Sequence, residues 1–588
     1  MAITAASSPP SLRDAVMAAA AVSFGFHGTL FHRTVATPGA VFDILGRRFG
    51  LPKFAQQRAA AGVDARDRMR LAGRREVTLA DIYDALPIES ALARAVMAAE
   101  IALELDLLRP DAEASDAFRH AHARGLPVLV VADTHLGRTF VREALSRHGL
   151  PSAAVFVSSD CNLTAAGSGD LFDLAIDYLD TPRDRVLHIG GDLAGDVAQA
   201  RAKGLMVLHH SASSGDEDDI ARVVPLPPPD TLSARDLGYH VAGPAAVGFL
   251  NWIERRVRKD GIGHVLFPVA AGHLLDRALK NYPGLWALPG HSLIPGSEVA
   301  FRLAAMDDQN FREHLPFLIS GSNGLRPFEV LERIGVPAPA PEIMARYGLG
   351  DESRLSPALH SRLRGFLFEY RFEILKVCRR NRRALLSHLR HLGLEPGRCV
   401  ALVDLSWDGA VQESFEAALR GLVTLSLQGY SFFGPAEGGP AEGGPAEGGE
   451  GPQRLSPQQR SAFFDADNVA PAIVRRLQSN RSLVRLLFSP LQNAIIGLEP
   501  TPDGARGLQD ERWDAEGDHA QATAALMDGA MAFIGDHAAA LAQGRAPAPA
   551  LETAWPLVDL LNRPVPLSDA LRPLANLDPW TDSARRAG

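Results

Sequence analysis

Residues that could carry out chemistry gather where short apolar runs end. One run leads into Gly25-Phe26-His27-Gly28-Thr29-Leu30, and a helical pattern follows from about residue 37. The apolar lead and the glycine-rich turn predict a buried strand that ends in a tight loop. Open α/β sheets bind ligands beyond such strand ends. Gly25, however, has no side chain and can neither attack a substrate nor bind a cation. His27 and Thr29 are the polar residues of this loop.

Three more apolar runs, over residues 127–131, 155–157 and 186–190, predict further buried parallel strands. Small or acidic residues stand at or just after their ends. A magnesium ion would need hard oxygen ligands, which only the carboxylates among them supply. The positions concerned are Ala132, Asp133, Ala165, Gly191, Asp192 and Asp196.

These four strand ends resemble, in order, the four motifs of the haloacid dehalogenase (HAD) superfamily. There the first strand ends in Asp-x-x-Gly-Thr-Leu, and that Asp is both the nucleophile and a ligand of Mg²⁺. The second motif ends in Ser or Thr, the third supplies a Lys, and the fourth supplies two more carboxylates. The resemblance implies an α/β fold, a HAD-like Rossmannoid parallel sheet with a helical cap inserted after the first strand.

Each of the four motifs lacks its key group in this chain. Gly25, Ala132, Ala165 and Gly191 stand where the resemblance implies Asp, Ser or Thr, Lys, and Asp. A one-residue slip at a strand end turns a side chain roughly the other way, so we expect Asp192 not to take the place of a ligand at Gly191. Asp196 is expected to stabilise the first turn of the next helix. We therefore predict a HAD-like fold without phosphatase activity and without the Mg²⁺ that the family uses.

The cap is predicted over about residues 37–120. Its helices begin near Pro38, at Thr78 as N-cap, and at Ala91. Glu100 and Glu104 lie one turn apart in the third helix, and we expect them to form a solvated face.

A second resemblance concerns one branch of the superfamily. Asp133-Thr134-His135-Leu136 resembles the Asp-Met-Tyr-Leu of proteins in which a HAD domain is joined to a second domain, often encoded with glycosyltransferases of surface-polysaccharide synthesis. The resemblance continues almost to residue 500 and implies glycosyltransferases or other envelope-polysaccharide proteins as partners. It divides the chain into a HAD-like domain (1–210), a linker (211–235), a second α/β domain (236–500) and a helical, Pro-rich region (501–588).

The second domain has its own candidate site. A predicted strand ends at Asp404, and Trp407 and Gln412 follow it before and within a predicted helix. A carboxylate at a strand end before a helix N-terminus is a usual ligand position. Alternatively, Asp404 and Gln412 cap the loop and Trp407 packs on the sheet. We expect the strand 265–269 to be a neighbour, which would place His273 across the crevice.

Two functions follow from these patterns. The first is a non-catalytic binding or scaffold protein. The second is an enzyme that acts on a sugar or nucleotide-sugar through the region of Asp404, with a residual HAD-type hydrolase as a variant of it. The absence of a lysine at Ala165, in the third motif, favours the first.

Composition limits the classes of protein to which the chain can belong. With 588 residues the chain is too long for one core. A net charge of −9 that is spread along the chain argues against nucleic-acid binding. Three cysteines without metal-ligand spacing indicate a reducing compartment, so we expect a cytoplasmic protein. The sequence contains no run of about 18 uncharged apolar residues, so it predicts no membrane span.

Residues 434–452 are a Gly/Pro/Ala/Glu repeat that lacks large apolar side chains, and we expect a disordered surface loop there. Deleting residues 437–449 should change the melting temperature by only a few degrees, because loop length enters the closure entropy logarithmically. Thermal unfolding of the deleted and full-length chains tests this. A deletion that prevents folding would show that the repeat packs against the domain.

Overall fold

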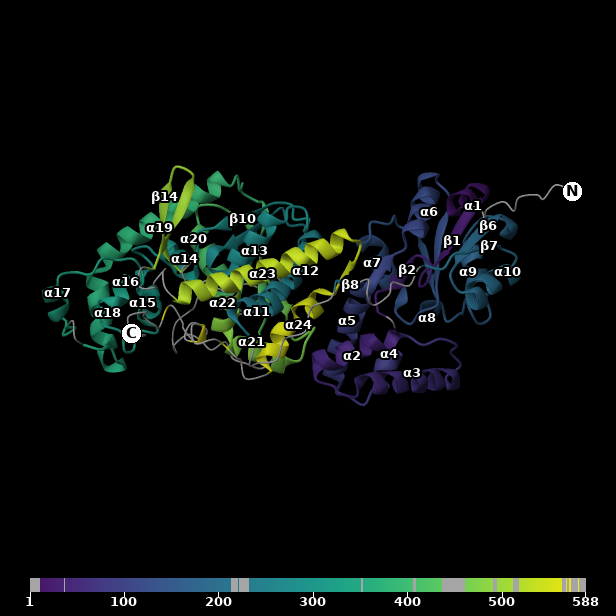
Figure 1. The fold of residues 1–588 in the computed structure, drawn as a ribbon, viewed down its shortest axis with the longest axis horizontal. Helices are drawn as coiled ribbons and strands as arrows, with labels where there is room; N and C mark the ends of the chain where they lie inside the picture. The colour runs from purple at the N-terminus through teal and green to yellow at the C-terminus, as the bar shows by residue number, and fades with distance from the viewer. Residues whose placement is uncertain are drawn as a thin grey trace. The chain divides into compact units, whose positions relative to one another are not determined.

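The structure is a computed structural model that forms two compact units (Figure 1). It describes residues 11–35, 37–212, 220–221, 232–350, 353–405, 409–435, 460–489, 494–510, 518–562, 567, 571–572 and 580. Unit 1 comprises Met1–Arg222, Asp467–Ala470 and Gly544–Pro549. Unit 2 comprises Val223–Ala466, Pro471–Gln543 and Ala550–Gly588.

Unit 1 is built on a five-stranded parallel sheet with the order β5-β4-β1-β6-β7. Every residue of β1, β4 and β6 is buried, as expected for central strands with helices on both faces. The chain thus runs outward from β1 to one edge and then returns to fill the other. The strands are β1 (Ala21–Gly25), β4 (Val128–Ala132), β5 (Ala154–Val157), β6 (Val186–Gly190) and β7 (Met206–His209).

Two hydrophobic layers cover this sheet. On one face, Val22, Phe24 and Val130 pack in a core that is shared with the cap. On the other face, Ala21 and Leu129 pack against a smaller layer. The helices of the first layer are α1 (Leu12–Ala18), α6 (Ala112–Ala123) and α7 (Gly137–Arg147), and those of the second are α9 (Asp170–Asp177) and α10 (Ala198–Ala202).

The cap is helical, as predicted, but it ends near residue 107 rather than 120. The antiparallel ribbon of β2 (Phe31–Arg33) and β3 (Leu108–Pro110) marks its boundary. Helix α6 belongs to the sheet layer, because its Phe118 packs on Phe24 of β1 at 5.2 Å between ring centroids. The cap helices are α2 (Pro38–Phe49), α3 (Phe54–Leu71), α4 (Leu79–Tyr83), which Thr78 caps, and α5 (Ser90–Leu107).

The prediction that Glu100 and Glu104 form a solvated face is wrong. Both are buried, with exposed fractions of 1% and 4%. Arg58 of α3 binds Glu100 in a bidentate pair at 2.7 and 3.0 Å, and Arg33 binds Glu104 at 2.7 Å. These arginines are distant in sequence, so helical spacing alone could not reveal that the two carboxylates are paired inside the cap.

Unit 2 contains a second five-stranded parallel sheet, with the order β10-β9-β11-β12-β13. In chain order this is 2-1-3-4-5, the flavodoxin-like arrangement, in which the strand order reverses between the first and third strands. The predicted adjacency of the strands ending near residues 269 and 404 is confirmed, since β9 and β11 pair directly. The strands are β9 (His264–Pro268), β10 (His291–Ile294), β11 (Cys399–Asp404), β12 (Ser426–Phe433) and β13 (Arg460–Phe464).

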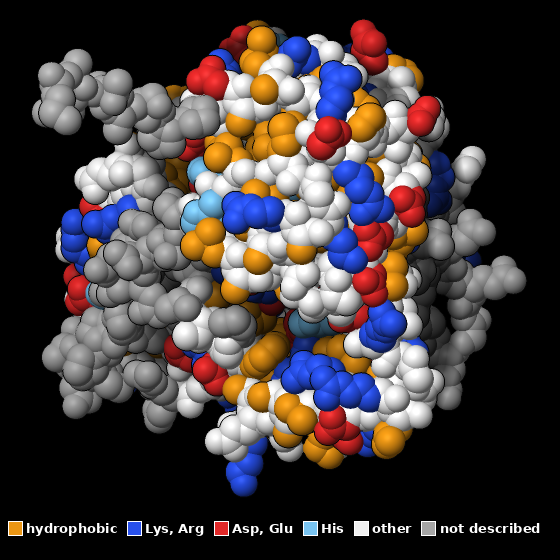
Figure 2. Space-filling model, turned by 90° about the vertical axis from the view of Figure 1, so that its right-hand side faces the viewer, with side chains coloured by type: hydrophobic (Ala, Val, Ile, Leu, Met, Phe, Trp, Pro, Cys, Tyr) orange, Lys and Arg blue, Asp and Glu red, His pale blue; other side chains and the backbone are white. Residues whose placement is uncertain are grey.

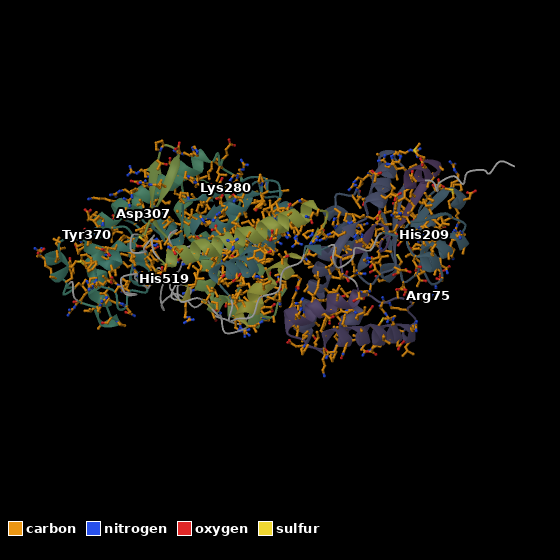
Figure 3. All side chains as sticks on the ribbon, viewed as in Figure 1. Arg75, His209, Lys280, Asp307, Tyr370 and His519 are labelled. Atoms are coloured by element: carbon orange, nitrogen blue, oxygen red, sulfur yellow. The ribbon has the colours of Figure 1, made fainter. Side chains whose placement is uncertain are left out.

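A helical insertion lies between β10 and β11 and has its own core around Leu318, Leu331 and Phe366. Asp307 and Tyr370, which Figure 3 labels, belong to it. Its helices are α14 (Glu298–Ala305), α15 (Phe311–Ile319), α16 (Glu329–Glu332), α17 (Pro341–Ala345), α18 (His360–Glu369) and α19 (Arg371–His391).

The remaining helices of unit 2 cover its sheet. Phe249 of α12 packs on Phe432 of β12 at 5.1 Å, within an aromatic cluster that also includes Phe463 and Phe488. Phe415 of α20 lies in the layer on Leu402 of β11. These helices are α11 (Ala234–Leu237), α12 (Gly243–Asp260), α13 (Val269–Asn281), α20 (Ala410–Leu419), α21 (Pro471–Ser479) and α22 (Arg481–Phe488).

The boundary that we predicted at residue 500 falls inside a hairpin, because β14 (Ile495–Thr501) pairs with β15 (Gly504–Gln509). Beyond it, α23 (Asp518–Ala542) and α24 (Ala550–Leu561) belong to unit 2. An ideal Cβ on Gly529 of α23 would lie 2.0 Å from the Arg235 carbonyl oxygen, so this helix packs backbone to backbone on α11.

The predicted linker is only partly described, and one piece of it is structured. β8 (Ile220–Ala221) pairs with β16 (Ala546–Pro547) within unit 1. The repeat beyond residue 435 and most of the Pro-rich end lie outside the described residues. Among the described helices none is long and apolar enough to cross a membrane. On the face that Figure 2 presents, basic, acidic and hydrophobic side chains of the described residues intermingle.

Candidate functional site

The HAD-like motifs meet at the carboxyl edge of the sheet in unit 1. β1 pairs in parallel with both β4 and β6, so the ends of these three strands lie side by side. The loop after β1 turns at Gly28, whose φ of 72° suits glycine. It closes through the Gly28 N–H, which donates to the Phe31 carbonyl at 2.8 Å. The predicted positions are therefore neighbours in space.

The space that a side chain at Gly25 would occupy is already filled. An ideal Cβ on Gly25 would lie 2.7 Å from Thr29 Oγ1 and 2.8 Å from Asp196 Oδ2. Both distances are below ordinary van der Waals contact. The carboxylate of Asp196 and the hydroxyl of Thr29 thus lie where a nucleophile at this strand end would begin.

The space for a side chain at Gly191 is occupied by backbone atoms rather than by side chains. An ideal Cβ there would lie 2.1 Å from the Gly28 carbonyl oxygen. That carbonyl is fixed, because it accepts a hydrogen bond of 2.8 Å from the Ala212 N–H. His209 of β7 (Figure 3) lies within hydrogen-bond distance, 3.1 Å, of the Gly191 carbonyl oxygen. No side chain fits at this position unless the loop after β1 moves.

Asp192 and Asp196 have different positions in the segment that follows β6. Asp192 is exposed and caps the π-helical segment Leu193–Val197 by accepting the Ala194 N–H at 3.0 Å. Asp196 does lie in the first turn of that segment, but its carboxylate is half-buried and faces Gly25. The segment that follows β6 therefore brings the second aspartate, not the first, toward the centre of the site.

The other two motif positions carry structural contacts. Asp133 accepts the N–H groups of Ala165 and Ala166 at 2.9 and 2.7 Å, which holds the loop of the third motif against the end of β4. Ala165 is buried in the smaller hydrophobic layer. Lys203 instead binds Asp173 and Asp170 beside this loop.

Acidic groups at the site perturb one another. Burial and the charges of Asp133 and Asp192 raise the pKa of Asp196 to about 6. Burial and the charge of Asp133 also raise the pKa of Glu76. Such shifts require carboxylates that are close together and poorly solvated. Binding a phosphate here would add further negative charge.

The cap closes over this edge with contacts that the sequence did not indicate. Asn162, in the left-handed conformation at φ 56°, accepts the N–H groups of Arg75 and Glu76 at 2.8 and 3.1 Å. Figure 3 shows Arg75, whose side chain binds Asp170 at 2.6 Å. The sequence signal that could have suggested these contacts is an isolated Asn after a short predicted strand.

A buried polar cluster of Arg58, Glu100, Tyr83 and His135 links the cap to the loop after β4. Tyr83 donates to Glu100 at 2.6 Å, and Arg58 Nη2 lies 3.3 Å from His135 Nε2. Burial alone would raise the pKa of Glu100, but these neighbours lower it to about 2. His27 is uncharged because burial lowers its pKa to about 3. The polar groups of this cluster pair with one another, so Arg58 is not available to bind a substrate.

The residues at the site do not fit the Mg²⁺ that a HAD-like fold implies. Two of the positions that would supply oxygen ligands are glycines, and neither has space for a side chain. Within the described ranges, no three His, Cys, Asp or Glu side chains converge as metal ligands. Asp196 alone is not a magnesium site.

In unit 2, Asp404 is buried at the end of β11, with an exposed fraction of 8%. Gln412 is buried as well and donates to Glu416 of its own helix at 3.1 Å, which favours a structural role for its amide. His273 is half-buried in the second turn of α13, and burial lowers its pKa. Trp407 lies outside the described residues.

The sequence analysis did not identify Arg460 of β13 as part of this region. Its guanidinium binds Glu413 at 2.6 Å, and its Cζ would lie 2.1 Å from an ideal Cβ on Gly409. Gly409, with φ at 71°, thus lets an arginine cross directly over the start of α20.

Comparison with solved structures finds HAD proteins among those similar to this chain. An L-2-haloacid dehalogenase from Xanthobacter autotrophicus with chloropropionic acid covalently bound is 17% identical, with a TM-score of 0.25, over 34% of this chain and 80% of its own. A HAD phosphatase from Thermococcus onnurineus is 19% identical, with a TM-score of 0.22, over 32% and 85%. A haloacid dehalogenase-like hydrolase from Bacteroides fragilis is 17% identical, with a TM-score of 0.23, over 34% and 91%.

Unit 1 is an α/β domain that consists of a five-stranded parallel sheet and a helical cap inserted after its first strand. Each of these likenesses covers about a third of this chain. No family model matches the chain, and no curated protein matches it.

Asp196→Asn should stabilise the protein at neutral pH. Because the pKa of Asp196 is raised from 3.8 to about 6 on folding, its charge opposes folding above that value and is neutral in both states below about pH 4. We expect a gain of about 1–2 kcal/mol at pH 8 that fades as the pH falls from 6 to 4. Urea unfolding across this range measures it. A substitution effect that does not change with pH would contradict the electrostatic arrangement at the site.

Proposed function

We propose that this protein is a non-catalytic HAD-like protein, a pseudo-phosphatase, that serves as a binding or scaffold component. One observation carries the proposal. The positions of the nucleophile and of the fourth-motif carboxylate, Gly25 and Gly191, are not open vacancies but are filled by Thr29, Asp196 and the Gly28 carbonyl. Such a site lacks both the attacking group and the room for one.

The charges around the site support the same proposal. The charges of Asp133 and Asp192 both act on Asp196, and among the described residues no ion pair joins these three aspartates to Lys or Arg. Phosphoryl-transfer sites need positive charge or metal ions to neutralise the transferred group. Here the local charge has the opposite sign.

The resemblance to the two-domain branch supports a role beside glycosyltransferases in cell-envelope polysaccharide synthesis. In that setting the partner would be another protein of the pathway, in the cytoplasm. A retained fold with a closed site suits a protein whose surfaces, rather than its strand-end pocket, carry the function.

The protein should not hydrolyse p-nitrophenyl phosphate with or without Mg²⁺. Gly25→Asp should not restore turnover, because the side chain meets Thr29 and Asp196 and because catalytic groups act as a unit. It should also lower the melting temperature, which differential scanning fluorimetry detects. The matched control is Gly365→Asp, on the exposed side of α18 (His360–Glu369), where the backbone is helical and an added Cβ meets nothing within 4 Å. Chelator-sensitive turnover by the unmodified protein would overturn the proposal.

A second candidate function is an enzyme that acts on a sugar or nucleotide-sugar through unit 2. The strand order 2-1-3-4-5 favours it, because ligands of such sheets bind where the order reverses, beyond the carboxyl ends of β9 and β11. Asp404 stands at that edge. A carboxylate there could accept hydrogen bonds from ligand hydroxyls, and Trp407 could stack on a sugar face.

Asp404→Asn and Trp407→Ala distinguish this function from a structural role. If the region binds a ligand, both variants should fold with unchanged circular dichroism but lose the thermal shift that a nucleotide-sugar gives the parent protein. If Asp404 only secures the loop, the first variant should lose stability and no nucleotide-sugar should shift the parent. A panel of nucleotide-sugars in the thermal-shift assay tests both outcomes.

A further inference from the structure

A single aromatic residue far along the chain is held by the helical insertion of unit 2. Trp580 lies 247 residues after Arg333, yet Arg333 Nη1 donates to the Trp580 carbonyl oxygen at 3.0 Å. The contact region consists of the end of α15 and the end of α16, which meet where Arg333 Nη2 donates to the Leu318 carbonyl oxygen.

Three different interactions recognise the Trp580 side chain. Its ring stacks on Phe317 with 4.6 Å between centroids and an interplanar angle of 11°. The Arg333 Cζ lies 3.8 Å from the ring centroid, which is cation–π geometry. The indole N–H donates to Ser320 Oγ at 2.9 Å. Together these contacts recognise the flat face of the indole ring, its attraction to a cation and its N–H group.

Arg333 is the feature that distinguishes this contact from ordinary packing. It is fully buried, at 0% exposure, and is the largest such side chain in the described part of the chain. A buried guanidinium is stable only where its donors find acceptors. One acceptor is the Leu318 carbonyl oxygen within the insertion and another is the carbonyl oxygen of Trp580, so Trp580 satisfies one of the donors of this arginine.

Residues 317, 318, 320 and 333 all belong to one short stretch of the insertion, in which Leu318 is part of the core and Phe317 packs against it. Arg333 is tied to this stretch by the hydrogen bond that it donates to the Leu318 carbonyl oxygen, while Trp580, which packs against the same core, comes from elsewhere in the chain. Tryptophan and arginine pairs of this kind dominate the energetics of many peptide interfaces.

We propose that residues 317–333 form a tryptophan-recognition socket for a peptide segment, and that Trp580 of the same chain occupies it as a detachable intramolecular ligand. The ligand class is a peptide that presents an indole together with its own backbone carbonyl. The socket is independent of the HAD-like site and of the region of Asp404, so it holds whether or not the protein is an enzyme.

The test uses the full-length chain with Trp580→Ala as receptor and a labelled synthetic peptide of residues 576–584 as probe. Fluorescence anisotropy should show binding to this variant. The unmodified chain should bind at least about tenfold more weakly, because its own segment fills the socket in most molecules. A peptide with alanine in place of the tryptophan, and a receptor that also carries Phe317→Ala, are the controls and should not bind. Equal affinity for both chains, or no binding to the variant, overturns the proposal.

A second measurement observes the intramolecular contact directly. In full-length protein labelled with 5-fluorotryptophan, the ¹⁹F signal that Trp580→Ala removes should be displaced from the solvent-exposed position, and Ser320→Ala should shift it. A signal at the exposed position means that the socket is empty and contradicts the proposal. Light scattering that shows a dimer dependent on Trp580 would instead assign the socket to a second copy of the chain and would also overturn it.

Discussion

Two backbone segments approach each other so closely at Gly28 and Gly191 that no side chain fits between them. This contact determines what the end of the HAD-like sheet can do. It removes one carboxylate position, it fixes the loop after β1, and it leaves Thr29 and Asp196 packed against Gly25. A chain that had merely lost its catalytic residues would keep an open pocket, whereas here neighbouring groups have taken the space. The tight packing at Gly25 and at Gly191 therefore results from one arrangement.

The cap is stabilised internally by a buried ion pair, in which Arg58 of α3 binds Glu100 of α5. A buried ion pair of this kind is costly to break, since the remaining partner would be left uncompensated. The cap is thus held together by contacts among its own residues.

Much of this fold follows from the sequence. Apolar runs predict β1, β4, β5 and β6 of the sheet of unit 1 but not β7, and the capping pattern at Thr78 predicts α4. What could not be predicted depends on long-range contacts. Helical spacing does not reveal that Arg58 binds Glu100. The dipeptide Gly191-Asp192 does not show that the carboxylate of Asp196 faces Gly25. The residues next to Trp580 in the sequence do not indicate that it contacts Arg333. The boundary at residue 500 failed because the hairpin β14–β15 pairs across it.

The central claim, that the site in unit 1 is closed to metal and phosphate, is tested most directly by isothermal titration calorimetry. Mg²⁺ with orthovanadate, a mimic of the transferred phosphoryl group, is titrated into the unmodified protein and into Asp196→Ala. The closed site predicts no saturable heat in either protein up to millimolar concentrations. Saturable binding of one equivalent to the unmodified protein, lost in Asp196→Ala, would contradict it and would show that the loop at Gly28 opens to admit a ligand.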